Sequence, residues 1–252
     1  MKYFMFVFLV LVLLTVLIKA EANVIHTVYF QPADQPAPTK ENIREVKSTM
    51  LKTQALYSRE LKRHGHTPKT FQIERDAAGL IVVHIVKGKH NLRTYSNYSL
   101  IRNELPPGIR DDPLWRETKI SVVFLAGAKN IANKAGIAER KCLGNICNNI
   151  AYIPTNIDLN IIKVQIAIHE VGHTFGLEHN PRNPPRGKSF VMVANTLFDL
   201  KNLFKLTDFL LDADEAELIN DHPFFNPNLS IPDYEVGNLL KTVWGALKIQ
   251  NR

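Results

Sequence analysis

Hydrophobic positions along the chain change between strand-like runs and helical spacing, and together they predict an α/β protein. The β-branched and aromatic run at 24–30 is typical of a strand. After a proline-rich loop, Thr39 is a candidate N-cap for a helix that extends to about residue 64, with Glu41 in its first turn. Apolar residues in that helix recur mostly at steps of three and four, so we expect one of its faces to be buried.

Further predicted elements follow in a mixed order. Strand-like runs at 70–75 and 80–86 flank "DAAG", which predicts a hairpin turn. The run "KISVVFL" at 119–125 has the continuous apolar character of a buried strand, and "IAYIPT" at 150–155 is a second candidate, with a loop rich in Gly and Asn expected between them. We predict helices at 114–117, 160–175 and 212–220, and a short apolar turn around Met192. This order is typical of helices packed on a mixed sheet.

The N-terminal segment at 1–22 is interpreted separately. A basic residue precedes an uninterrupted apolar run at 3–18, and Ala20 and Ala22 form an A-x-A pattern. This is the pattern of a signal peptide cleaved before Asn23, and it predicts a secreted, extracellular protein. An uncleaved membrane anchor is the second interpretation, although the run is shorter than the roughly 20 residues that span a bilayer. A buried helix is the third.

The rest of the chain divides into one domain at 23–228 and a C-terminal tail at 229–252, which would be a docked helix or a partner-binding segment. The formal net charge is +7, but basic residues are spread along the chain apart from a group at 58–69. We interpret that group as a solvated helix end, with an anionic glycan or membrane surface as the alternative partner. We expect no nucleic-acid partner, because no binding motif is present. We also expect a monomer without stable membrane association once the signal is removed.

Cys142 and Cys147 are the two cysteines of the chain. In an oxidising compartment their spacing predicts a local disulfide that closes "CLGNIC". Free thiols are the alternative, and a zinc site built from this pair is disfavoured because no second pair completes it. Sequons at Asn97 and Asn228 would carry glycans if the chain enters a eukaryotic secretory pathway.

The candidate chemistry lies in "HEVGHTFGLEH" at 169–179. His169 and His173 are four residues apart on a predicted helix, so both imidazoles leave the same face and can meet one ion. Gly176 stands where a left-handed residue can end the helix and turn the chain, which would bring His179 back to the same point. Three imidazoles with an open fourth position are the arrangement of a catalytic zinc site.

Glu170 follows the first of these histidines and is the candidate general base. A carboxylate in this place can accept a proton from a zinc-activated water and pass it to a departing amine, so the pattern predicts peptide-bond hydrolysis with one Zn²⁺. Two other functions stay open. One is a catalytically inactive binding or toxin-like module that keeps zinc for structure and would not require Glu170, and the other is a zinc hydrolase of non-peptide amides.

The motif resembles the zinc signature of the metzincin metallopeptidases. The resemblance implies zinc ligands at His169, His173 and His179, a catalytic base at Glu170 and a turn glycine at Gly176. It also implies a methionine turn beneath the metal. Met192, 13 residues after the third histidine, is the candidate, with ordinary core packing as the alternative.

The resemblance extends upstream to about residue 24 and implies a twisted mixed sheet with two long helices. It places the cleft between an upper and a smaller lower subdomain. The subfamily stays open, because Asn180 stands where reprolysins usually have Asp and Ala194 stands where astacins have Tyr. A matrixin-like cysteine switch is absent, and we expect no conventional prodomain.

The remaining histidines carry weaker signals. His64 and His66 are interpreted as surface groups at a helix end, with a second metal as the minor alternative. No ligand spacing connects the others, which are His26, His84, His90 and His222. The acidic run at 212–217 is explained by the dipole of the helix it begins, with calcium binding as the lesser alternative.

Overall fold

The computed structural model describes residues 23–110, 118–132, 134–157, 160–179, 189–190, 192 and 209–230. The predicted signal peptide, the predicted helix at 114–117 and the tail from residue 231 onward lie outside these residues. Within the described part of the chain, no helix combines the length and the apolar character needed to cross a bilayer.

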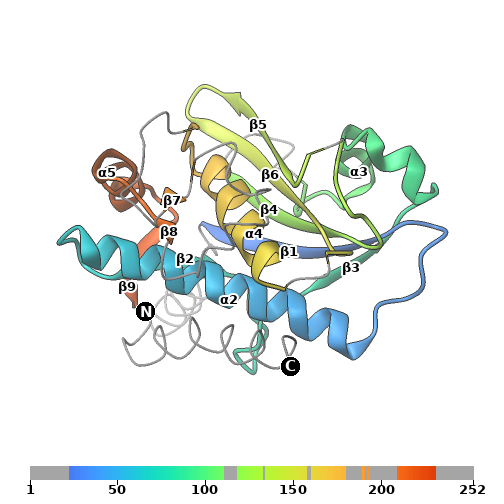
Figure 1. Ribbon diagram of the computed structural model, residues 1–252, viewed down its shortest axis with the longest axis horizontal. Coiled ribbons are helices and arrows are strands. Elements are labelled where there is room, and N and C mark those ends of the chain that lie inside the picture. Colours follow the sequence, from blue (N-terminus) through green and yellow to red (C-terminus); the bar gives the residue numbers. More distant parts are fainter. Residues whose placement is uncertain are drawn as a thin grey trace, which may run out of the picture.

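A mixed sheet forms the centre of the molecule (Figure 1). In the described residues it has seven strands in the order β5-β6-β4-β1-β2-β9, and β3 also pairs with β1. The strands are β1 (Val24–Gln31), β2 (Lys69–Ile73), β3 (His84–Lys87), β4 (Lys119–Leu125), β5 (Ile137–Leu143), β6 (Ile146–Pro154) and β9 (Phe225–Ser230). The central strands run parallel, whereas β5 and β9 are antiparallel to their neighbours. The predicted fold class is confirmed. β7 (Ser189–Phe190) and β8 (Phe209–Leu210) form a separate small pair.

Helices cover both faces of this sheet. The long helices α2 (Lys40–Arg63) and α4 (Asn160–Thr174) lie across one face, as Figure 1 shows, and share a core with Ile25 and Tyr29 of β1. The short helices η1 (Leu92–Ser96) and α3 (Ser99–Glu104) pack with Val28 and Phe30 of the same strand. Since successive side chains of a strand point to opposite faces, odd and even positions of β1 face different helix layers. The remaining helix is α5 (Ala213–Asp221).

Local capping explains where two helices begin. Thr39 caps α2: its hydroxyl accepts a hydrogen bond from the Asn42 amide, and the Asn42 side chain accepts one from the Thr39 amide. Asp212 and Glu215 form the same reciprocal arrangement at the start of α5. The predicted N-cap and the predicted helix near 212–220 are therefore confirmed, and two of the acidic residues there serve as caps.

The predicted hairpin around "DAAG" is wrong in part. A turn does form, because the backbone of Asp76 bonds to Gly79 and Leu80 and its carboxylate accepts from two amides. The flanking strands β2 and β3, however, do not form a hairpin with each other. Both run parallel to β1 along the same edge of that strand. The segment that connects them, residues 74–83, contains a single isolated antiparallel bridge, between Arg75 and Ile81. Pairing with the buried central strand prevails over the local pairing that the turn suggests.

The region between β4 and β6 also differs from the prediction. We expected a loop, but β5 forms there and pairs with β6 through a tight turn at Gly144, whose φ is +60°. Cys142 and Cys147 are directly opposite each other in this hairpin and form the predicted disulfide. The β5 sequence is rich in charged residues and half exposed, so it lacks the apolar pattern that would have revealed it.

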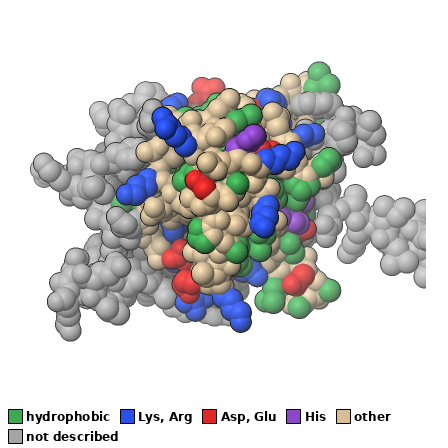
Figure 2. Space-filling model, turned by 90° about the vertical axis from the view of Figure 1, so that its right-hand side faces the viewer, with side chains coloured by type: hydrophobic (Ala, Val, Ile, Leu, Met, Phe, Trp, Pro, Cys, Tyr) green, Lys and Arg blue, Asp and Glu red, His purple; other side chains and the backbone are tan. Residues whose placement is uncertain are grey.

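One face of the molecule shows how the basic side chains are distributed there (Figure 2). On the face drawn in Figure 2, the blue Lys and Arg side chains lie scattered among other residue types. Among the coloured residues of this face, they do not merge into one continuous basic patch.

Candidate metal centre and cleft

Helix α4 packs against both the sheet and the neighbouring helix α2. The Tyr57 hydroxyl of α2 donates to the Ile168 carbonyl at 2.8 Å, and the Asn149 side chain of β6 donates to the Thr174 carbonyl at 2.7 Å. Lys163 forms a 3.0 Å ion pair with Glu45 of α2. Almost every residue of α4 is buried, which explains its apolar sequence. The helix is therefore a rigid support for the side chains at its C-terminal end.

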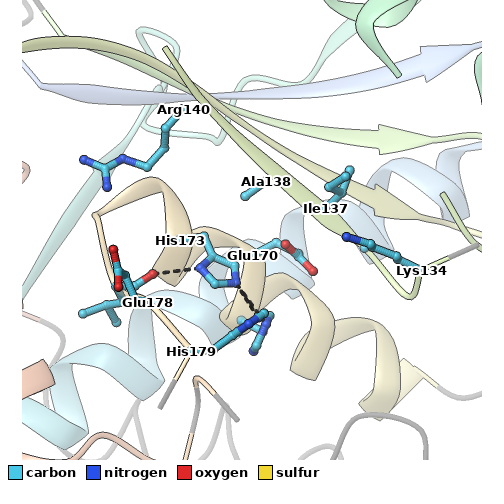
Figure 3. A pocket seen from close by; sticks show the side chains of 11 residues that line it. Lys134, Ile137, Ala138, Arg140, Glu170, His173, Glu178 and His179 are labelled. Atoms are coloured by element: carbon cyan, nitrogen blue, oxygen red, sulfur yellow. Dashed lines mark hydrogen bonds between the residues drawn. The ribbon is translucent and has the colours of Figure 1, made fainter. Parts of the chain in front are cut away.

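Three histidine side chains converge at that end (Figure 3). The His173 Nε2 atom lies 3.2 Å from the His169 Nε2 atom and 3.1 Å from the His179 Nε2 atom. Nitrogen ligands about 2.0–2.1 Å from one tetrahedral ion lie about 3.3 Å from one another. Both distances from His173 are therefore close to the separation that a single bound ion requires, and the third pair of nitrogens lies within 4.8 Å.

A turn after α4 brings the third histidine to the other two. Gly176 has φ +95°, and its amide bonds to the His173 carbonyl at 3.0 Å. The Leu177 amide bonds to the Gly172 carbonyl at 3.1 Å, which completes a Schellman motif. The left-handed conformation at Gly176 reverses the chain and leads directly to His179.

The orientation of His173 leaves its Nε2 atom free to bind a cation. Its Nδ1 atom donates to the Leu177 carbonyl at 2.8 Å, which places the ring proton on Nδ1 and the lone pair on Nε2. Burial lowers the pKa of His173 and outweighs the opposing effect of this hydrogen bond. The ring is therefore neutral at physiological pH, as a metal ligand must be.

Glu170 is buried in the wall of the same cavity, and only 5% of it is exposed. Burial raises its pKa to about 8, and the positive charge of Lys134 opposes this rise. Gly136 allows the β4–β5 connection to approach the carboxylate, since a Cβ atom there would lie 2.7 Å from Glu170 Cγ and from Ile166 Cγ2. A side chain at position 136 would therefore conflict with Glu170 and Ile166.

The cavity in front of these residues has a volume of about 370 Å³. One side of it is formed by α4 and the turn after it, and the other by β5 and the connection before it (Figure 3). Its lining residues are Lys134, Gly136, Ile137, Ala138, Arg140, His169, Glu170, His173, Leu177, Glu178 and His179. The sequence did not predict that residues at 134–140 line the cavity. No motif marks them, and their strand was predicted as a loop.

Met192 lies directly against α4 and is fully buried. A Cβ atom on Gly172 would be 2.6 Å from the Met192 sulfur and 2.8 Å from the Tyr57 hydroxyl oxygen. Gly172 lies in α4 between His169 and His173, directly before His173. The absence of a side chain there lets Met192 pack beneath the histidine pair.

The histidines outside the motif and the two sequon asparagines lie in different parts of the structure. His64 ends α2 with its Nε2 atom 2.9 Å from the Leu211 carbonyl oxygen, and His66 lies 3.4 Å from Glu217. His222 packs on Phe175, and burial lowers its pKa to about 4. Of the two sequon residues, Asn97 is exposed after η1 and Asn228 lies within β9. His26 and His84, to which no ligand spacing was assigned, both contact Glu74.

Comparison with known proteins identifies the family. A sequence model of the reprolysin-like metallopeptidases, family M12B, matches residues 15–180, which include the whole histidine motif. The chain belongs to this family. The predicted membership of the metzincin clan is thereby confirmed, and the family implies a metal ion at the histidine cluster.

Solved structures show that the fold of this reprolysin-like chain is shared. Wild-type OgpA from Akkermansia muciniphila is similar with a TM-score of 0.57 and 17% identity, over 82% of this chain and 63% of that one. A catalytically inactive OgpA in complex with an O-glycopeptide substrate, glycodrosocin, is similar with a TM-score of 0.54 and 13% identity, over 84% and 62%. The chain therefore spans less than two thirds of the length of these proteins. No curated protein sequence matches the chain.

Proposed function

We propose that this chain is a secreted zinc endopeptidase in which His169, His173 and His179 hold one Zn²⁺ and Glu170 is the general base. The observation that carries the proposal is the convergence of three Nε2 atoms, 3.1–3.2 Å apart along the cluster, in the same cavity as a buried carboxyl. Membership of a metallopeptidase family supports the same activity.

The donor set suits zinc. Neutral imidazoles are preferred zinc ligands, and three of them leave one coordination position open, as in catalytic zinc sites. When bound, zinc supplies Lewis-acid chemistry, since it polarises a carbonyl and makes water acidic enough to lose a proton near neutral pH. The histidines would hold the ion at the cavity wall, where a substrate carbonyl could reach it.

Glu170 would handle the proton in this reaction. Its carboxylate accepts a proton from the attacking water and returns it to the departing amine, so that no charged amine anion forms. A buried carboxyl with a raised pKa holds a proton more strongly than an ordinary glutamate, which suits a group that must accept and then return one. Lys134, across the cavity, moderates that effect.

A peptide substrate would bind in extended form along β5. Among the described strands, β5 pairs only with β6, so the backbone groups of its outer edge are available to another strand. Ile137, Ala138 and Arg140 of β5 also line the cavity. A peptide added at this edge would pass in front of the three histidines. Because a similar structure holds an O-glycopeptide, glycosylated peptides belong among the substrates tested.

Localisation and assembly complete the proposal. The pattern at 1–22 supports export through a cleaved signal peptide, and the Cys142–Cys147 disulfide suits an oxidising compartment. We propose an extracellular monomer whose partner is its peptide substrate, without nucleic acid or stable membrane attachment.

The test is the Glu170→Gln variant, with zinc content and hydrolysis of casein and of an O-glycosylated peptide measured together. We expect unchanged zinc and a rate lower by about 10²- to 10⁴-fold, the usual contribution of a general base. Glu217→Gln, a substitution of a surface glutamate on α5, is the control and should keep full activity.

Two outcomes would contradict the proposal. Undiminished hydrolysis by Glu170→Gln would remove this residue from its role. A wild-type protein that contains its zinc but cleaves no peptide, glycosylated or not, would instead favour the inactive binding or toxin-like module.

A further inference from the structure

A second group of ligand-type side chains lies outside the cleft. The Glu74 Oε2 atom is 2.7 Å from the His26 Nδ1 atom and 2.6 Å from the His84 Nε2 atom. Each residue offers one ligand atom, and the three atoms lie within 4.8 Å of one another. Two imidazole nitrogens thus converge on a single carboxylate oxygen.

These residues come from three different segments of the sheet. His26 belongs to β1, Glu74 directly follows β2, and His84 is the first residue of β3. The register of β3 on β1 pairs His84 with Val28, and His26 shares a strand face with Val28 because it is two residues away. That face packs against α3 and η1, so the sheet itself separates this group from the cleft on α4.

We propose that His26, Glu74 and His84 form a second zinc site. Two imidazoles and one carboxylate are a donor set that zinc binds in proteins. The side chains are 14%, 20% and 28% exposed for His26, Glu74 and His84, so an ion can enter while the ligands stay largely shielded from water. The proposal does not depend on the function of the three-histidine cluster.

The carboxylate oxygen of Glu74 needs to move only a little to become a ligand beside the two imidazole nitrogens. Ligand atoms around tetrahedral zinc lie about 3.3 Å apart, so the carboxylate oxygen must move about 0.6–0.7 Å from each nitrogen. The two ring nitrogens lie within 4.8 Å of each other. Zinc would then replace the contacts that now join the three groups, and water would take the remaining position.

The site would link the segment that connects β2 and β3 to the central strand β1. This connecting segment is stabilised by the Asp76–Gly79 turn, by an isolated bridge and by a hydrogen bond from the Val82 amide to the Glu74 carbonyl. Glu74 and His84 lie at its two ends, and His26 lies on the neighbouring strand. A metal that binds all three groups only in the folded state stabilises that state by mass action.

The first test uses the full chain with His173→Ala, which removes a ligand from the cleft but leaves the second group intact. Titration with Zn²⁺ alone, followed by calorimetry, should show one remaining site with a dissociation constant in the micromolar range or tighter. The same chain with His84→Ala added should bind no zinc. Absence of binding to the His173→Ala chain would overturn the proposal without any concern about the folding of His84→Ala.

The second test counts zinc in purified chains by elemental analysis. We expect two ions per wild-type chain, one in His84→Ala and one in Glu74→Gln, with peptide hydrolysis at 25 °C retained in both. Zinc should also raise the melting temperature of wild-type protein by about 5 °C or more beyond its effect on His84→Ala. His66→Ala, which removes a histidine paired with a single carboxylate, is the matched control and should still hold two ions.

The outcomes separate the two zinc sites. If the cleft does not bind zinc, His173→Ala will not lower the count, whereas His84→Ala still will. If His84→Ala and Glu74→Gln both keep the wild-type count, the second site does not exist, and His26, Glu74 and His84 form hydrogen bonds only.

Discussion

The two histidine groups of this protein are built in opposite ways. The cleft group takes all three ligands from an eleven-residue stretch at 169–179, on one helix and the turn after it. The sheet group takes His26, Glu74 and His84 from three segments, and its two histidines are 58 positions apart. The first is set by the local geometry of one helix and its turn, and the second exists only once the sheet is assembled.

The groups also differ in what surrounds their nitrogens. In the cleft, three nitrogens face one another, and the second nitrogen of His173 is occupied by a backbone carbonyl. In the sheet group, the imidazoles already have a carboxylate partner, which can satisfy them without an ion. An ion in the sheet group must replace contacts that already satisfy its imidazoles, so we expect the cleft group to bind zinc more tightly than the sheet group.

The largest expected effect comes from His173→Ala. This change removes the central ligand of the cleft, so zinc there should be lost and peptide hydrolysis should fall below detection. Elemental analysis and casein digestion check both effects. Zinc in the sheet group should be unaffected, and a variant that keeps its cleft zinc would contradict the ligand assignment.

An intermediate effect is expected from Gly172→Ala, which tests whether the cleft depends on close packing beneath α4. The new Cβ atom would meet the Met192 sulfur at 2.6 Å, and overpacking of this kind costs about 1–3 kcal/mol. The better helix propensity of Ala returns at most about 1 kcal/mol. Denaturant unfolding should show a net loss, together with weaker zinc binding in the cleft only.

A double variant supplies the control for this prediction. If Met192 causes the conflict, Gly172→Ala combined with Met192→Ala should cost less than the sum of the two single changes. Strict additivity would mean that the sulfur does not limit position 172.

The smallest effect concerns Glu74 in protein freed of zinc by a chelator. Burial raises the pKa of Glu74, but hydrogen bonds from His84 and His26 outweigh this and hold it below the usual 4.5. A lowered carboxyl pKa stabilises the fold above the unfolded value, and this contribution is lost as the pH falls through the folded value. Glu74→Gln should therefore lower the melting temperature by about 2–4 °C at pH 7. The difference should shrink below pH 4.5, and a constant difference across that range would contradict the role of the carboxylate charge.

The difference between the two groups also explains what could be predicted from the sequence. The i, i+4 spacing of His169 and His173 and the glycine after them depend on local geometry, so the cleft cluster was predictable residue by residue. The long helix after Thr39 and the buried strand at 119–125 were predictable for the same reason, since periodicity and capping are local signals.

Features set by strand register were not predictable. His26, Glu74 and His84 meet because β2 and β3 both align with β1, and nothing in their spacing indicates that alignment. β5 is an edge strand with charged residues, so it lacks the apolar alternation of a strand, and its cavity-lining residues Ala138 and Arg140 were missed with it. The disulfide was predicted although the hairpin that contains it was not.

The most direct test of the central claim is anomalous diffraction at the zinc absorption edge from crystals of the Glu170→Gln chain. We predict a peak about 2.0–2.1 Å from the Nε2 atoms of His169, His173 and His179. An empty position between these three atoms in zinc-containing crystals, or an ion held in the cleft by other residues, would contradict the account.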